Sequence, residues 1–185
     1  MRSAKNFRTD YEMILRFLDA LGEGSVMLTS SKQARPGFFI FAHVFMREYV
    51  EDIFFRKEEL LIKALQDNGF PPDDGPVDTM RVEQKKSLEA ATHILNAAKG
   101  WQAGDEDARA EVGWATSEYT STLRQHIARL KNLIFPLLEQ NMSPDDEHKI
   151  AEGLNALAFE KDPKDVSDKY TKLLESLEDE LSDWK

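Results

Sequence analysis

The chain has no cysteine among its 185 residues. Disulfide bonds, thiol catalysis and thiolate metal ligands are therefore excluded. The sequence also lacks an N-terminal hydrophobic leader and any apolar run of membrane-spanning length. Together these absences predict a soluble, cytoplasmic protein with no membrane partner.

Basic residues are fewer than acidic ones, 24 against 34, which gives a formal net charge of −10. Such a charge argues against non-specific binding to nucleic acid and against docking on anionic lipid. The hydrophobic content of 41% is that of a folded globular protein and not of a disordered one. We expect a single domain over residues 1–185, because this length fits one compact core.

No stretch alternates between apolar and polar residues for long enough to predict a strand. Helical spacing predicts instead four long helices, at about residues 10–21, 36–66, 77–99 and 107–140. Gly22 and Gly24 predict the end of the first helix, with a polar loop following over residues 23–35. Two more helices are expected within about 144–185, beginning at Pro144 and at Asp162-Pro163. The predicted fold is all-α, an antiparallel up-down four-helix bundle with additional C-terminal helices.

Helical wheels place one polar side chain of each bundle helix on the inward, apolar face. These side chains are Tyr11, Glu58, Gln84 and His126. Glu59 and Glu83 are predicted to lie at the flank or surface, whereas Leu133 and Leu137 are predicted to face inward. A buried carboxylate such as Glu58 is costly unless it is paired, protonated or bound to a metal. The four inward polar residues are therefore the candidate site.

Several short motifs follow one another along the chain in a characteristic order. They are Asp10-Tyr11, Phe54-Phe55-Arg56-Lys57-Glu58-Glu59, Gly75-Pro76 with Glu83-Gln84, and His126-Ile127-Ala128-Arg129-Leu130 running into Ile134-Phe135-Pro136. With these motifs the chain resembles the hemerythrin-like family, whose domain is also called the HHE cation-binding domain. The resemblance spans nearly the whole chain and implies the same helical bundle.

In that family, histidines and bridging carboxylates hold two non-haem irons inside the bundle. The resemblance implies that four ligand positions have lost their ligand, namely Tyr11, Phe54, Gln84 and Leu130. Only Glu58 and His126 keep the identity of a ligand. The resemblance therefore implies a degenerate metal site without a bound cofactor.

Three interpretations of the candidate site remain open at this point. In the first, Glu58 accepts hydrogen bonds from His126 and from Tyr11 or Gln84 in a buried network, since buried polar groups are normally satisfied within the protein. In the second, Glu58 and His126 hold a single iron or other divalent metal, with Tyr11 or Gln84 assisting. In the third, a small molecule occupies the vacated interior of the bundle.

The sequence gives little support to catalysis. It has no Ser-His-Asp arrangement, no glycine-rich phosphate loop and no second inward carboxylate for an acid/base pair. We therefore expect a structural, regulatory or protein-interaction role and no enzymatic activity, with a homo-oligomer or another protein as partner. The alternative is an altered metal site used in oxygen or redox sensing or in iron handling.

Overall fold

The structure is a computed structural model that describes residues 1–160 and 163–185, and the side chains of all of these except 163–165. Its helices are α1 (Ala4–Ser30), α2 (Pro36–Phe45), α3 (Arg56–Asp67), α4 (Gly75–Gln102), α5 (Asp107–Arg129), α6 (Phe135–Asn141), α7 (Pro144–Glu160) and α8 (Pro163–Asp183). Two π-helical segments, η1 (Met46–Phe55) and η2 (Leu130–Ile134), join α2 to α3 and α5 to α6. The described residues contain no strand, so the all-α prediction is confirmed. The predicted start of the last helix at Asp162 lies outside the described residues.

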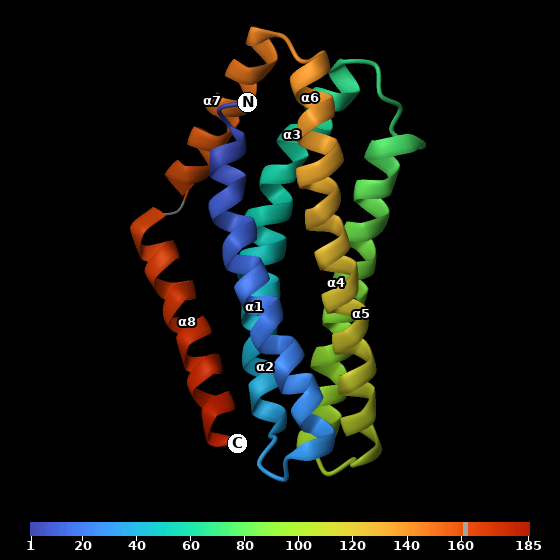
Figure 1. Ribbon diagram of the computed structural model, residues 1–185, viewed down its shortest axis with the longest axis vertical. Helices are drawn as coiled ribbons and strands as arrows, with labels where there is room; N and C mark the ends of the chain where they lie inside the picture. Colours follow the sequence, from blue (N-terminus) through green and yellow to red (C-terminus); the bar gives the residue numbers. More distant parts are fainter. Residues whose placement is uncertain (161–162) are drawn as a thin grey trace.

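Four long rods make up the bundle, as Figure 1 shows. They are α1, the continuous α2–η1–α3 rod, α4, and the continuous α5–η2–α6 rod. Short connections reverse the chain between them, so neighbouring rods run antiparallel. The predicted second, third and fourth helices agree with these rods to within a few residues.

The C-terminal helices pack outside the bundle, with α7 over α3 and α8 alongside α1 and α2 (Figure 1). The inward face of α8 is apolar and buried, consisting of Tyr170, Leu173, Leu174, Leu177 and Leu181. Ion pairs Arg16–Glu178 and Arg56–Glu160 join the C-terminal helices to α1 and α3. Exposed pairs of this kind contribute little, so burial of the apolar face is what fixes α8 on the bundle.

The predicted end of the first helix at Gly22 and Gly24 is wrong. The helix runs on to Ser30, and the predicted loop 23–35 shrinks to the residues after it. Gly24 serves close packing instead, because a Cβ atom there would lie 2.6 Å from Cε1 of Phe38 on α2. Leu28, one turn further on, continues the buried face of the helix. Gly24 does not mark a helix end because glycine is also used where two helices approach closely, and Gly22 is a tolerated glycine inside the helix, with no atom within 4 Å of its Cβ position.

The prediction for Leu133 and Leu137 is off by one residue. Leu133 is 38% exposed and Leu137 is only partly buried, whereas Ile134 and Leu138 are buried. The π turn of η2 explains the shift, because it accommodates one more residue than an α turn and rotates everything after it. Helical wheels drawn at a constant 100° per residue therefore fail beyond Leu130.

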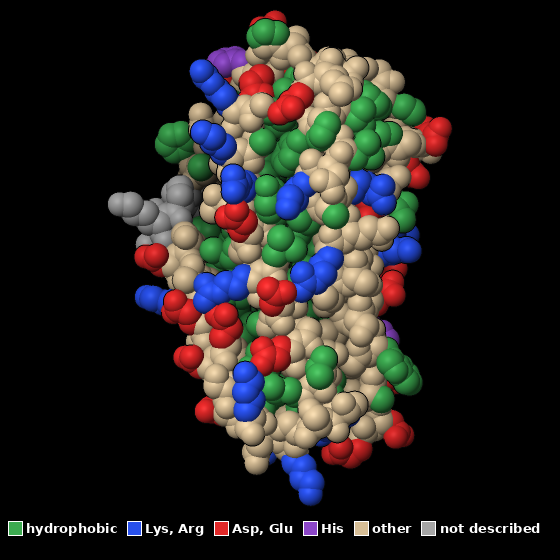
Figure 2. Space-filling model, in the orientation of Figure 1, with side chains coloured by type: hydrophobic (Ala, Val, Ile, Leu, Met, Phe, Trp, Pro, Cys, Tyr) green, Lys and Arg blue, Asp and Glu red, His purple; other side chains and the backbone are tan. Residues whose placement is uncertain are grey.

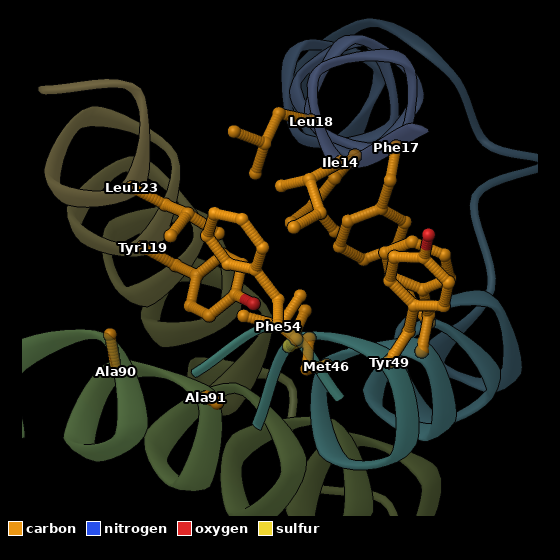
Figure 3. Packing of buried hydrophobic residues seen from close by; sticks show 14 of the residues in the cluster. Ile14, Phe17, Leu18, Met46, Tyr49, Phe54, Ala90, Ala91, Tyr119 and Leu123 are labelled. Atoms are coloured by element: carbon orange, nitrogen blue, oxygen red, sulfur yellow. The ribbon is translucent and has the colours of Figure 1, made fainter. Parts of the chain in front are cut away.

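Phe54 fills the centre of the bundle. Its ring projects from η1 into the space between α1 and α5, among Ile14, Leu18, Tyr119 and Leu123 (Figure 3). All five side chains are at most 1% exposed. Outside this core, acidic and basic side chains are intermingled on the face shown in Figure 2. No described helix is long and apolar enough to cross a membrane.

Candidate functional site: a buried ion network

Glu58 and His126 form a buried pair at the centre of the candidate site. His126 Nε2 lies 2.9 Å from Oε1 and 2.7 Å from Oε2 of Glu58, so the same ring nitrogen faces both carboxylate oxygens. Gln84 Nε2 donates a further hydrogen bond to Glu58 Oε1, at 3.1 Å. Gln84 lies well inside α4 and His126 lies in α5 before η2 begins, so regular α-helical spacing predicts their inward orientation. Glu58 lies in the first turn of α3, directly after η1, and shares its inward face with Leu61 one turn later.

Glu83 extends the network on the other side of the imidazole ring. Its Oε1 lies 3.6 Å from His126 Nδ1, which is too long for a hydrogen bond but short enough for an ion pair. Arg129 Nε donates to the same oxygen at 2.8 Å. The prediction that Glu83 lies at the flank or surface is wrong, since only 6% of it is exposed. Arg129, one turn after His126 on α5, supplies the cation that allows this carboxylate to be buried.

The network favours a protonated histidine. Burial lowers the pKa of His126, but the negative charge and hydrogen bond of Glu58, together with Glu83, outweigh it and raise the pKa to about 9. For Glu83, burial raises the pKa, but the nearby His126 and Arg129 lower it by more. The pKa of Glu83 therefore lies below its usual value. Two carboxylates, one imidazolium and one guanidinium therefore balance one another in charge near neutral pH.

Tyr11 does not join this network, contrary to the prediction. It is only partly buried, and its ring lies under the ammonium group of Lys131, 5.4 Å from the ring centroid. On α1, the inward position predicted for Tyr11 is occupied by the preceding residue, Asp10, which is 5% exposed. Asp10 accepts hydrogen bonds from the Tyr49 hydroxyl at 2.8 Å and from Lys57 Nζ at 2.7 Å.

Asp10, Tyr49 and Lys57 thus form a second polar cluster that sequence reasoning missed. A signal for it exists, because Asp10 stands four residues before Ile14 and seven before Phe17, both fully buried. Burial and the charge of Asp10 raise the pKa of Tyr49 above its usual range, so the tyrosine stays a hydrogen-bond donor.

The family model for the Hemerythrin HHE cation binding domain matches residues 5–138. The chain belongs to the hemerythrin family. The match begins near the start of α1 and ends at Leu138 in α6, so it includes all four rods of the bundle and leaves α7 and α8 outside. No curated protein and no solved structure matches the chain.

Two of the ligand positions that the resemblance implies carry no metal donor in this bundle. A di-iron site needs several nitrogen and oxygen donors around a shared centre. The implied ligand positions Phe54 and Leu130 carry no lone pairs and are fully buried. Both oxygens of Glu58 and Nε2 of His126 face each other. Among the described residues, no group of three or more histidines and carboxylates is arranged to hold a metal ion.

Proposed function

We propose that this member of the hemerythrin family works without a metal. In this proposal the protein has a structural, regulatory or protein-interaction role, including self-association, and no catalytic activity. The observation that carries it is the Glu58–His126 pair, in which the imidazole ring lies 2.7 Å from the carboxylate that the family resemblance assigns to metal binding. Because the pKa of His126 is raised to about 9, the ring is protonated near neutral pH, and its charge stabilises the buried carboxylate in the way a bound cation would.

The side chains around the pair support the same proposal. Phe55 lies edge-on to the His126 ring, with centroids 5.7 Å apart. Phe54 and Leu130 fill the neighbouring volume with apolar atoms. A metal entering here would have to displace close-packed side chains and break the ion pair, and both changes are unfavourable.

Elemental analysis of protein purified without chelator tests the proposal directly. We expect well under one iron per chain and no near-ultraviolet oxo-iron absorption. Iron, manganese or zinc in stoichiometric amount would contradict it and would support the altered single-metal site at Glu58 and His126 instead.

Restoring the implied ligands gives a second test. The triple variant Phe54→His, Gln84→His and Leu130→Glu should take up more iron than the wild type. A matched control puts the same new residues on the same rods at exposed positions, as Phe41→His, Val82→His and Leu133→Glu. If the first variant takes up no more iron than the control, the assignment of ligand positions is wrong.

A further inference from the structure

The face formed by α4 and α5 lies on the side of the bundle away from the C-terminal helices. Helix α7 packs on α3, and α8 packs on α1 and α2 (Figure 1). An open groove with a volume of about 360 Å³ lies between α4 and α5. The small, buried side chains Ala90 and Ala115 line it together with the longer Lys86, Trp114 and Glu118. The face is therefore hollowed along the line where the two helices meet.

Trp114 stands beside this groove with 70% of its surface exposed. The other two tryptophans, Trp101 and Trp184, are only 7% and 5% exposed. Val82, which is 45% exposed, adds a second apolar side chain one turn before Lys86 on α4. Tryptophan is enriched at protein interfaces and among the residues that carry most of their binding energy. A tryptophan exposed next to a groove therefore indicates a surface that another protein covers.

The charges on this face favour a second copy of the chain as the partner. Lys86 on α4 and Glu118 on α5 both line the groove, and neither forms an ion pair with a described residue. A face with one unpaired cation and one unpaired anion is complementary in charge to itself, as a twofold interface requires. A partner that presents charges of only one sign would leave Lys86 or Glu118 unpaired.

The register of α4 and α5 places a small residue beside the tryptophan. Nε2 of His93 on α4 lies 3.4 Å from Oε2 of Glu111 on α5, and the two helices are antiparallel. Three residues earlier on α4 is Ala90, and three residues later on α5 is Trp114. Because both helices rise equally per residue, Ala90 lies level with Trp114. The space above Ala90 can therefore take a large side chain from outside the chain.

We propose that this face is a twofold interface between two copies of the chain, with Trp114 of each copy packed on Ala90 of the other. A twofold axis that lies in the interface, parallel to α4 and α5, sets α4 of one copy against α5 of the other at the same level. By the same register Lys86 lies level with Glu118, so each Lys86 meets Glu118 of the other copy. The inference rests on the self-association that the proposed function includes.

The face is large enough for such a dimer. Helix α5 has 23 residues and α4 has 28, so they run side by side for about 35 Å. Two helices are about 20 Å wide, which gives a face of roughly 700 Å². A standard stable interface buries about 800 Å² on each partner, so the face of the two helices accounts for nearly all of it.

Sedimentation velocity of the full-length chain over a series of concentrations tests the interface. The buffer contains about 0.15 M salt, which screens the repulsion between two chains of net charge −10. We expect a dimer whose fraction rises with concentration. Trp114→Ala should weaken it about tenfold or more, whereas Val26→Ala, at a position 71% exposed on α1, should leave it unchanged. A chain that is monomeric at every concentration, or a dimer unaffected by Trp114→Ala, would overturn the proposal.

Reversal of the charges tests the arrangement of the two copies. Lys86→Glu and Glu118→Lys should each weaken the dimer about tenfold or more, because like charges then face each other twice across the interface. The double variant exchanges the partners within each ion pair and should restore the dimer. Lys63→Glu, at an exposed position on α3, is the control and should have no effect. A double variant as weak as the single ones would overturn the proposed pairing of Lys86 with Glu118.

The metal content of the same samples separates this inference from the proposed function. A metal-free monomer would overturn the interface alone. A dimer that contains stoichiometric metal would support the interface and overturn the proposal that the protein works without a metal.

Discussion

Nε2 of His126 lies within 2.9 Å of both carboxylate oxygens of Glu58, and neither side chain is more than 1% exposed. A charge-paired contact of this kind inside a bundle makes each partner necessary for burial of the other. Each partner also has a second contact. Gln84 donates a hydrogen bond to Glu58, and the Glu83 carboxylate lies beside His126, so the loss of either partner also leaves one of these groups without its contact.

Removing one partner should therefore cost more than removing both. His126→Leu leaves the Glu58 carboxylate buried without its cation, and we expect it to lower the free energy of unfolding by about 3–5 kcal/mol. The double variant Glu58→Leu with His126→Leu should recover a large part of that loss, because two apolar side chains can pack where the ion pair was. Urea unfolding of the single and double variants measures the coupling. Additive losses would show that the two residues do not depend on each other.

The protonation of His126 predicts a loss of stability at alkaline pH. A group whose pKa is raised from 6.5 to about 9 on folding stabilises the protein fully below 6.5. That contribution disappears as the pH rises through about 9, so the free energy of unfolding should fall by on the order of 3 kcal/mol between these values.

Urea unfolding at a series of pH values tests this window. His126→Gln, which keeps a donor for Glu58 without a titrating group, should flatten the alkaline fall. His93→Gln serves as the control, because His93 is exposed on α4 and should leave the profile unchanged. On the acid side, the lowered pKa of Glu83 predicts stability that is lost as the pH drops below 4.5.

The register change at η2 predicts unequal costs for two neighbouring residues. Ile134→Ala removes a fully buried side chain and should lower the free energy of unfolding by about 2–5 kcal/mol. Leu133→Ala removes a side chain that is 38% exposed and should cost less than about 1 kcal/mol. A reversed order in chemical denaturation would mean that the helix continues as a regular α-helix through this segment.

Two glycines of α1 predict opposite effects for the same substitution. Gly22 has no atom within 4 Å of the Cβ position, so Gly22→Ala should stabilise the helix by roughly 0.5–1 kcal/mol. Gly24→Ala meets the buried ring of Phe38 at 2.6 Å and should destabilise by about 1–3 kcal/mol despite the same gain in helix propensity. Thermal unfolding of the two variants distinguishes these roles, and equal shifts would contradict the close packing of α1 on α2.

The central residues could be predicted wherever a helix keeps its regular period. Gln84 and His126 lie in such stretches, Glu58 lies in the first α-helical turn after η1, and both Gln84 and His126 are hydrogen-bonded to Glu58. The inward position predicted for Tyr11 is off by one residue. On a helical wheel the aromatic ring of Tyr11 fits the apolar face as well as the neighbouring Asp10 does. The surface position predicted for Glu83 is wrong for another reason. Its burial depends on Arg129 from a different helix, and the wheel of a single helix contains no information about such partners.

The π turn of η2 has a consequence for changes in chain length. A π turn is an α turn with one additional residue, so deletion of a single exposed residue there, such as Asn132, would restore regular hydrogen bonding without moving the buried side chains that follow. Elsewhere in a helix the same deletion would rotate every later residue by about 100° and turn the buried face outward. The fourth rod therefore contains an internal position where a one-residue difference in length is tolerated, a tolerance that regular α-helical segments lack and that loops between helices share.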